Sequence, residues 1–87
     1  MTTSKTKADI AHGMAETAIS FAKAETGIDM DLKTLTCDYL DGGVGHVRYE
    51  AEMVRRTRSL IFININAVVD GTRVATGAAI LSISDGV

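Results

Sequence analysis

One face of a predicted helix carries polar side chains that could take part in chemistry. His12, Glu16 and Ser20 recur at intervals of four residues, so in a helix they lie one turn apart on the same face. This spacing places a carboxylate beside an imidazole and a hydroxyl. The alternative is an ordinary solvated face, on which Glu16 pairs with His12 or Lys23 and Ser20 is simply exposed.

Three arginines form a second cluster, at the end of an alternating segment. Arg55, Arg56 and Arg58 lie close together in the sequence, and guanidinium groups bind phosphate through paired hydrogen bonds. The strand alternation predicts that Arg55 faces the apolar side, which makes Arg56 and Arg58 the better candidates for an anion. The alternative is a solvated, highly charged hairpin turn.

The remaining reactive or polar residues favour structural roles. Cys37 has no basic neighbour to activate its thiol. The Gly-rich stretch 41–45 lacks the Lys-Ser/Thr ending of a phosphate loop and is predicted to be a turn. Asn64 and Asn66 share one face of a strand, where they either line a cleft or cap a half-polar surface. With one Cys and two His far apart, no metal is predicted, and no cofactor motif is present.

Length and composition limit the class of protein. Eighty-seven residues make one small domain, and a formal net charge of −2 with four aromatic residues and no Trp argues against nucleic-acid binding. No apolar run approaches the roughly 18 residues that span a bilayer, so no membrane association is expected. A single Cys fits a reducing compartment, and we expect a cytoplasmic protein. Because so short a chain has a thin stability margin, self-association is expected.

The hydrophobic pattern predicts one helix that positions the polar face. After a polar tail at 1–6, residues 7–26 show helical spacing, and Gly27 is a candidate C-cap. Asp9, His12, Glu16, Ser20 and Lys23 fall on the side opposite the apolar stripe. That stripe consists of Ile10, Ala11, Met14, Ala15, Ala18, Phe21 and Ala22.

Four antiparallel strands are predicted between residues 31 and 84, where the apolar period changes to two. Their expected ranges are 32–40, about 46–54, 60–69 and 74–83. The strand at 60–69 is expected to be central because both its faces carry apolar residues. Asp70-Gly71 is a strong hairpin signal. The predicted fold class is α+β, one long helix wrapped by a curved four-stranded sheet in a single domain.

This order of elements and several local strings resemble the hotdog fold, in particular the PaaI-like acyl-CoA thioesterases. The strings are Met14-Ala15-Glu16-Thr17-Ala18 in the helix, residues 51–60, and Asp70-Gly71 through Val74-Ala75-Thr76-Gly77. The likeness covers about residues 8–84. It implies a hotdog-like domain that assembles as a homodimer or homotetramer, with acyl-CoA sites between subunits. The strand at 32–40 is then the expected pairing edge.

The resemblance also implies roles for particular residues in thioester hydrolysis. It puts the catalytic carboxylate at Glu16 and a water-orienting hydroxyl at Ser20. The oxyanion donor is a backbone N–H at the helix start, equivalent here to Ala8. Arg56 and Arg58 are the expected ligands of the CoA phosphates, and Asn64 is a further ligand-binding candidate.

Two departures from the family pattern leave other functions open. The family has a further strand before the helix, whose loss leaves an open edge at residues 46–54. It also has a His-Gly-Gly stretch whose place is taken here by Lys7-Ala8-Asp9. The alternatives are a non-catalytic module that binds an acyl-CoA or small apolar ligand, an assembly unit, or a sheet edge that receives a strand from another protein.

Overall fold

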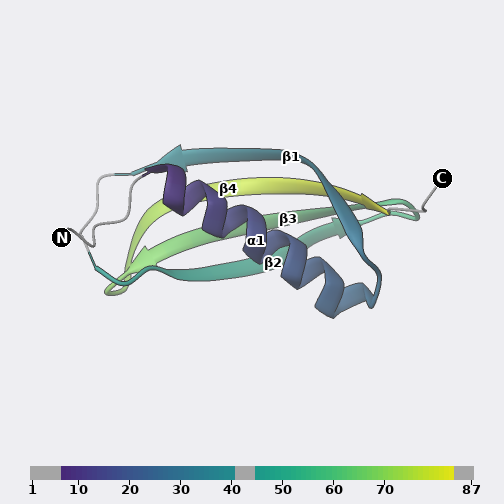
Figure 1. Ribbon diagram of the computed structural model, residues 1–87, viewed down its shortest axis with the longest axis horizontal. Helices are drawn as coiled ribbons and strands as arrows, with labels where there is room; N and C mark the ends of the chain where they lie inside the picture. Colours follow the sequence, from purple (N-terminus) through teal and green to yellow (C-terminus); the bar gives the residue numbers. More distant parts are fainter. Residues whose placement is uncertain (1–6, 41–44, 84–87) are drawn as a thin grey trace.

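The computed structural model describes residues 7–40 and 45–83. Along them lie the helix α1 (Lys7–Thr26) and the strands β1 (Met30–Tyr39), β2 (Arg48–Arg56), β3 (Leu60–Val69) and β4 (Thr72–Ile83). The strands pair antiparallel in the order β1-β4-β3-β2, and α1 lies across one face of the curved sheet (Figure 1). The predicted α+β architecture is therefore confirmed. The predicted tail at 1–6 and turn residues 41–44 lie outside the described residues.

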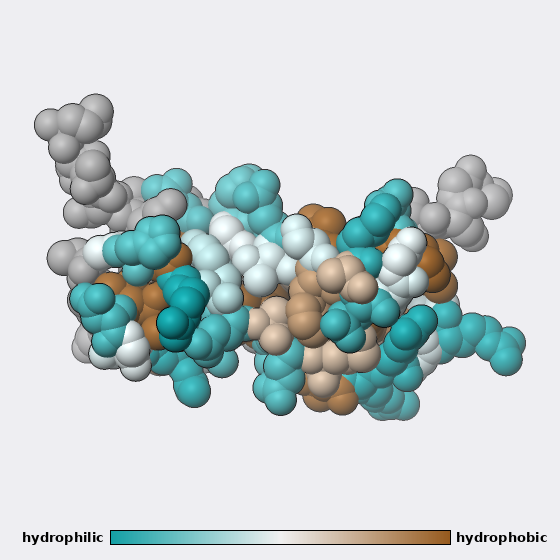
Figure 2. All heavy atoms as spheres, turned by 90° about the horizontal axis from the view of Figure 1, so that it is seen from below, coloured by the Kyte–Doolittle hydropathy of each residue, from teal (hydrophilic) through white to brown (hydrophobic). Residues whose placement is uncertain are grey.

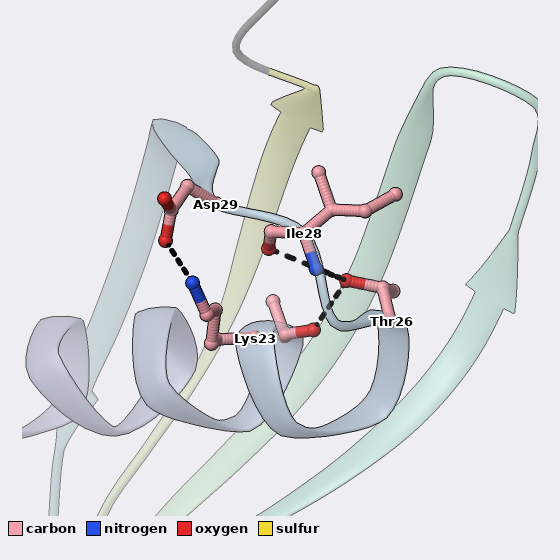
Figure 3. Close-up of polar contacts among 5 residues, drawn as sticks. Lys23, Thr26, Ile28 and Asp29 are labelled. Atoms are coloured by element: carbon pink, nitrogen blue, oxygen red, sulfur yellow. Dashed lines mark hydrogen bonds and ion pairs between the residues drawn. The ribbon is translucent and has the colours of Figure 1, made fainter.

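The helix begins and ends where its sequence pattern predicts. Met14, Ala18 and Ala22 are fully buried against the sheet. At the C-terminal end, the Gly27 N–H donates to the carbonyl of Lys23 at 2.7 Å. The Thr26 hydroxyl donates to the Ala22 carbonyl at 2.7 Å and accepts from the Ile28 N–H at 3.1 Å (Figure 3). The bond to Lys23 satisfies a carbonyl that the last turn leaves without a helical partner.

An ion pair joins the helix to the segment that leads into β1. Lys23 Nζ lies 2.6 Å from Asp29 Oδ1, and the two side chains point toward each other across the connection (Figure 3). Both side chains are largely exposed, so the pair contributes little stability.

The strands differ from the predicted ranges mainly at their ends. β3 matches the prediction and lies between β4 and β2. β4 begins at Thr72, two residues earlier than predicted, because the Asp70-Gly71 turn is tight. Asp70 and Gly71 have φ values of 51° and 80°, the backbone of a two-residue hairpin that favours Gly. β1 and β2 lie at the two edges of the sheet, as predicted for both segments.

A β-bulge in β2 overturns the predicted orientation of Arg55. The register shifts between Met53, paired with Ile63, and Arg55, paired with Phe62. Val54 is the extra residue, so the alternation reverses after it. Arg55 therefore lies on the sheet face away from α1, and the prediction that it faces the apolar side is wrong. Arg56, paired with Ile61, lies on the helix side.

The core fills the space between α1 and the inner face of the sheet. Ile61, Ile63 and Ile65 of β3 are buried there, with Leu81 and Ala79 of β4 as their cross-strand neighbours. The alternate residues of β3 point to the outer face, which includes the exposed Asn64. Side chains that share α1 with the core residues but point away from the sheet are free to form a site.

Candidate functional site

A groove runs between the polar side of α1 and strand β2. Its volume is about 520 Å³, and it is lined by Gly13, Glu16, Thr17, Ser20, Phe21, Tyr49 and Ala51. The helix supplies the carboxylate and hydroxyl groups, whereas β2 supplies a phenol and a methyl group. The face of the molecule in Figure 2 is pale to tan in its middle, and teal side chains are mixed with brown ones toward both ends. The groove thus combines a few polar groups with a weakly apolar lining, as small-molecule sites do.

Glu16 and Ser20 both line the groove, as their spacing on one helix face requires. The Glu16 carboxylate also contacts His12, with Nε2 and Oε2 3.4 Å apart. Both side chains are well exposed, Glu16 to 69% and His12 to 72%. One interpretation of the helix face, a solvated His–Glu pair, therefore coexists with the groove. The carboxylate is accessible both to water and to a ligand.

Tyr49 closes the groove on the side of β2. It pairs with Ala67 on the inner face of the sheet, and its phenol lies against the backbone of Gly13. A methyl group added at position 13 would overlap this ring, with only 2.8 Å to Cε2. Burial, together with the negative charge of Asp9, raises the pKa of the Tyr49 phenol above its ordinary value of 10.0. The hydroxyl is therefore protonated at neutral pH.

The predicted oxyanion donor lies at the start of the helix. α1 begins at Lys7, so the Ala8 N–H belongs to the first turn, whose N–H groups have no acceptor within the helix. Asp9 follows in the same turn. Its carboxylate interacts favourably with the positive end of the helix dipole but repels a second negative charge nearby. Ala8 and Glu16 lie eight positions apart, which is about 12 Å along a helix axis.

The predicted anion ligands lie at a different end of the molecule. Arg56 and Arg58 line a narrow pocket at the turn between β2 and β3, beside Thr26 and Ile28 at the C-terminal end of α1. The structure thus brings the two arginines together with each other, but not with Glu16. Their guanidinium groups are exposed.

Asn64 does not join either cluster within one chain. It pairs with Glu52 and Ala78 on the outer face of the sheet, opposite the helix and the groove. Asn66, two residues on, shares this face as predicted, and its Oδ1 accepts a hydrogen bond from the Thr76 hydroxyl at 2.9 Å. Asn66 therefore fits the second alternative for these amides, in which they cap a half-polar surface rather than line a cleft.

Sequence reasoning missed the β2 wall of the groove. The period of two predicts a strand at about 46–54 but does not single out Tyr49. A signal was nevertheless present, because a glycine in the interior of an Ala-rich helix is unfavourable by about 1 kcal/mol relative to Ala and indicates close packing. Gly13 is such a residue, but the sequence does not say which ring lies over it.

Neither a known family model nor any curated protein matches this chain. Solved structures do. A protein of the thioesterase superfamily superposes with a TM-score of 0.83 at 19% identity, over 93% of this chain and 63% of its own. A Bacillus halodurans protein crystallised with CoA superposes with a TM-score of 0.86 at 15% identity, over 97% of this chain and 58% of its own. A hypothetical thioesterase from Streptococcus pneumoniae, with coenzyme A, superposes with a TM-score of 0.80 at 12% identity, over 93% of this chain and 67% of its own.

These likenesses define the class of fold. This chain has the hotdog fold of thioesterase-superfamily proteins, one helix packed on a curved antiparallel sheet. It spans less than two thirds of the length of the first two of those structures.

No helix in the described part of the chain is long and apolar enough to cross a membrane. No group of three or more His, Cys, Asp and Glu side chains in residues 7–40 and 45–83 is placed to hold a metal ion.

Proposed function

We propose that this chain binds acyl-CoA in the groove between α1 and β2 and hydrolyses the thioester. The observation that carries the proposal is the joint lining of one groove by Glu16 and Ser20, over an apolar wall that includes Phe21 and Ala51. CoA in two of the solved neighbours supports the ligand class. The fold alone does not carry the function, since one fold serves many activities.

Glu16 is the proposed general base. Its carboxylate accepts a proton from water while the water oxygen bonds to the thioester carbon. The carbonyl oxygen becomes an oxyanion, then the C–S bond breaks and the proton passes to the CoA thiolate. Ser20, one turn along the helix, is the proposed hydrogen-bond partner of the attacking water. A carboxylate 69% exposed has direct access to that water.

The spacing of Ala8 and Glu16 requires two copies of the chain. A reacting carbonyl must lie about 3 Å from both the oxyanion donor and the base or its water. The two groups are about 12 Å apart along one helix, so a single chain cannot supply both. Two helices side by side and antiparallel bring Ala8 of one copy beside Glu16 of the other, and a two-fold axis makes two such sites at once.

Arg56 and Arg58 are the proposed ligands of the CoA phosphates. Arg56 follows Ala51 of the groove by five strand residues, a separation of about 16 Å in an extended strand. An extended pantetheine arm spans such a distance. With the thioester near Glu16, the phosphates then reach the pocket that both arginines line.

A second candidate function is acyl-CoA binding without catalysis. It is favoured by the contact of Glu16 with His12 at 3.4 Å, which engages the carboxylate, and by Asp9 at the helix start, which opposes an oxyanion there. In this case the groove and the arginines serve the same ligand, and only the chemical step is missing.

The test compares wild type with Glu16→Gln on short, medium and aromatic acyl-CoAs. Thiol release and calorimetric binding are measured together, and Glu25→Gln, a change of another exposed helix glutamate, is the control. Loss of a general base lowers the rate by about 100-fold or more, so we expect that loss with binding retained. Activity that survives in Glu16→Gln would show that Glu16 is not the general base. Binding without hydrolysis in wild type would favour the second candidate, and absence of binding would refute both.

A further inference from the structure

The phenol of Tyr49 is the one polar group that β2 contributes to the groove lining. It lies over Gly13, and Gly13 and Glu16 are three residues apart on α1. Residues at this spacing are neighbours on a helix surface, with about 5–6 Å between their Cβ positions. The hydroxyl therefore lies about one helical turn from the proposed base, across the same groove.

The position of this ring is determined by its packing. Tyr49 points to the inner face of the sheet because of its place in the β2–β3 register, opposite Ala67. The absence of a side chain at Gly13 lets the ring approach the helix backbone, and any larger residue would displace it. A side chain held between a strand and a helix loses little further freedom when a ligand binds.

The hydroxyl is a hydrogen-bond donor available to a ligand. Among the described residues it has no protein hydrogen-bond partner, although it lies in a half-buried position. Burial and the charge of Asp9 raise its pKa, which keeps the proton on the oxygen at neutral pH. A neutral O–H donor beside a carboxylate acceptor is the pair of groups that a reacting carbonyl and its water require.

We propose that the Tyr49 hydroxyl donates a hydrogen bond to the carbonyl oxygen of the bound acyl thioester. The inference rests on the proposed acyl-CoA ligand and adds a donor from the same chain as Glu16. A carbonyl oxygen has two lone pairs, so it accepts from Tyr49 and from the Ala8 N–H of a second copy together. The bond strengthens as negative charge develops on that oxygen.

The test separates the carbonyl from the rest of the ligand. In a Glu16→Gln background, which prevents turnover, the affinities of Tyr49 and Tyr49→Phe proteins are measured for an acyl-CoA and for the S-alkyl-CoA of equal chain length, which lacks the carbonyl. One lost hydrogen bond corresponds to about 5- to 10-fold in affinity. We expect that loss for the acyl-CoA and no change for the thioether. Tyr39→Phe, a change on the opposite edge strand, is the control and is expected to alter neither.

The possible results distinguish this inference from the proposed function. Equal affinities of the two proteins for acyl-CoA, or equal losses for both ligands, would overturn the role of Tyr49 and leave acyl-CoA binding intact. If the Glu16→Gln protein that retains Tyr49 binds neither ligand while its thermal unfolding is normal, the proposed function fails and this inference fails with it. If Tyr49→Phe weakens binding of the acyl-CoA alone, and the wild-type protein does not hydrolyse that acyl-CoA, the Tyr49 contact is supported and the proposed hydrolase activity is refuted.

Discussion

Met14 and Glu16, two residues apart on α1, show how one helix serves both the core and the groove. Met14 is fully buried, and its thioether accepts a hydrogen bond from the Cys37 thiol at 3.5 Å. Gly77 of β4 makes room for it, since a methyl group there would lie 2.8 Å from Met14 Cε. Glu16 points to the opposite side. The helix that carries the proposed base is therefore anchored by a residue that makes no contact with the groove.

Truncation of this anchor should destabilise the protein strongly. We expect Met14→Ala to lower the free energy of unfolding by about 2–5 kcal/mol, because it removes buried apolar surface and leaves a cavity. Met14→Leu, which keeps the volume, should lower it by less than about 1.5 kcal/mol. Urea unfolding measures both. A loss below about 1 kcal/mol for Met14→Ala would contradict the packing described here.

The raised pKa of Tyr49 makes the native state sensitive to alkali. Folding raises this pKa, so the native state holds the phenolic proton more tightly than the unfolded chain. The protonated phenol contributes its full stabilisation of the native state below the unfolded pKa of about 10, and this stabilisation is lost as the pH rises through the higher native pKa. Between about pH 9 and 11 the free energy of unfolding should fall less for Tyr49→Phe than for wild type. Denaturant unfolding at a series of pH values measures this.

Tyr39 does not confound that comparison. Its pKa is raised mainly by a hydrogen bond with Cys37, and this residue is present in both proteins. Identical alkaline slopes for wild type and Tyr49→Phe would show that the Tyr49 phenol is solvated in the native state.

At the scale of elements, the packing of α1 on β2 depends on the pair Gly13 and Tyr49. With Tyr49 present, we expect Gly13→Ala to lower the free energy of unfolding by about 1–3 kcal/mol through steric overlap. In a Tyr49→Ala background the same change should raise it by about 0.5–1 kcal/mol, since Ala favours the helix. A double-mutant cycle by urea unfolding measures the reversal of sign.

The edge strand on the other side provides the matched control for this cycle. In a Tyr39→Ala background, Gly13→Ala should still be destabilising, because the ring that an added methyl group at position 13 meets is that of Tyr49. Additive effects of Gly13→Ala and Tyr49→Ala would mean that the ring does not lie over the helix backbone.

The bulge at Val54 is the other determinant of the site at this scale. By inserting one residue it places Arg55 on the outer face of the sheet and Arg56 on the helix side, next to the pocket at the end of α1. Neighbouring arginines thus face opposite surfaces. Only the inner one, with Arg58 from the turn, lines that pocket.

At the scale of the whole molecule, exposed apolar side chains lie on α1 and on the edge strand β2. Ile19 is 41% exposed on the same side of α1 as Glu16 and Ser20, and Val54 is 57% exposed on edge strand β2. A second copy packed helix to helix would cover Ile19 and would complete the site with its Ala8. The proposed site shared between two copies and the exposed Ile19 thus involve the same surface.

We therefore expect a dimer or larger assembly that depends on Ile19. Sedimentation should show wild type as a multimer, whereas Ile19→Glu should shift it toward monomer with its far-ultraviolet circular dichroism retained and thioester hydrolysis lost. Val54→Glu, an equal change of charge on the β2 edge, should leave the helix-to-helix contact intact. A wild-type monomer that hydrolyses acyl-CoA at full rate would rule out a site shared between two copies.

Local sequence patterns were enough to predict the secondary structure and the fold class. The apolar spacing of residues 7–26 defined both faces of the helix, and Asp70-Gly71 defined the β3–β4 hairpin. The period of two in residues 60–69 predicted a central strand, because both its faces are partly apolar. These features follow from interactions between near neighbours in the chain, which recur at the helical or strand period.

The shape of the groove was decided by contacts between distant residues. Whether a phenol lies over Gly13 depends on the register of β2 against β3, and the side taken by Arg55 depends on a bulge that no local pattern marks. Asn64, predicted to bind a ligand, is separated from Glu16 by the sheet itself. Sequence periodicity tells which residues share a face of their own element, but the packing of elements determines which faces meet.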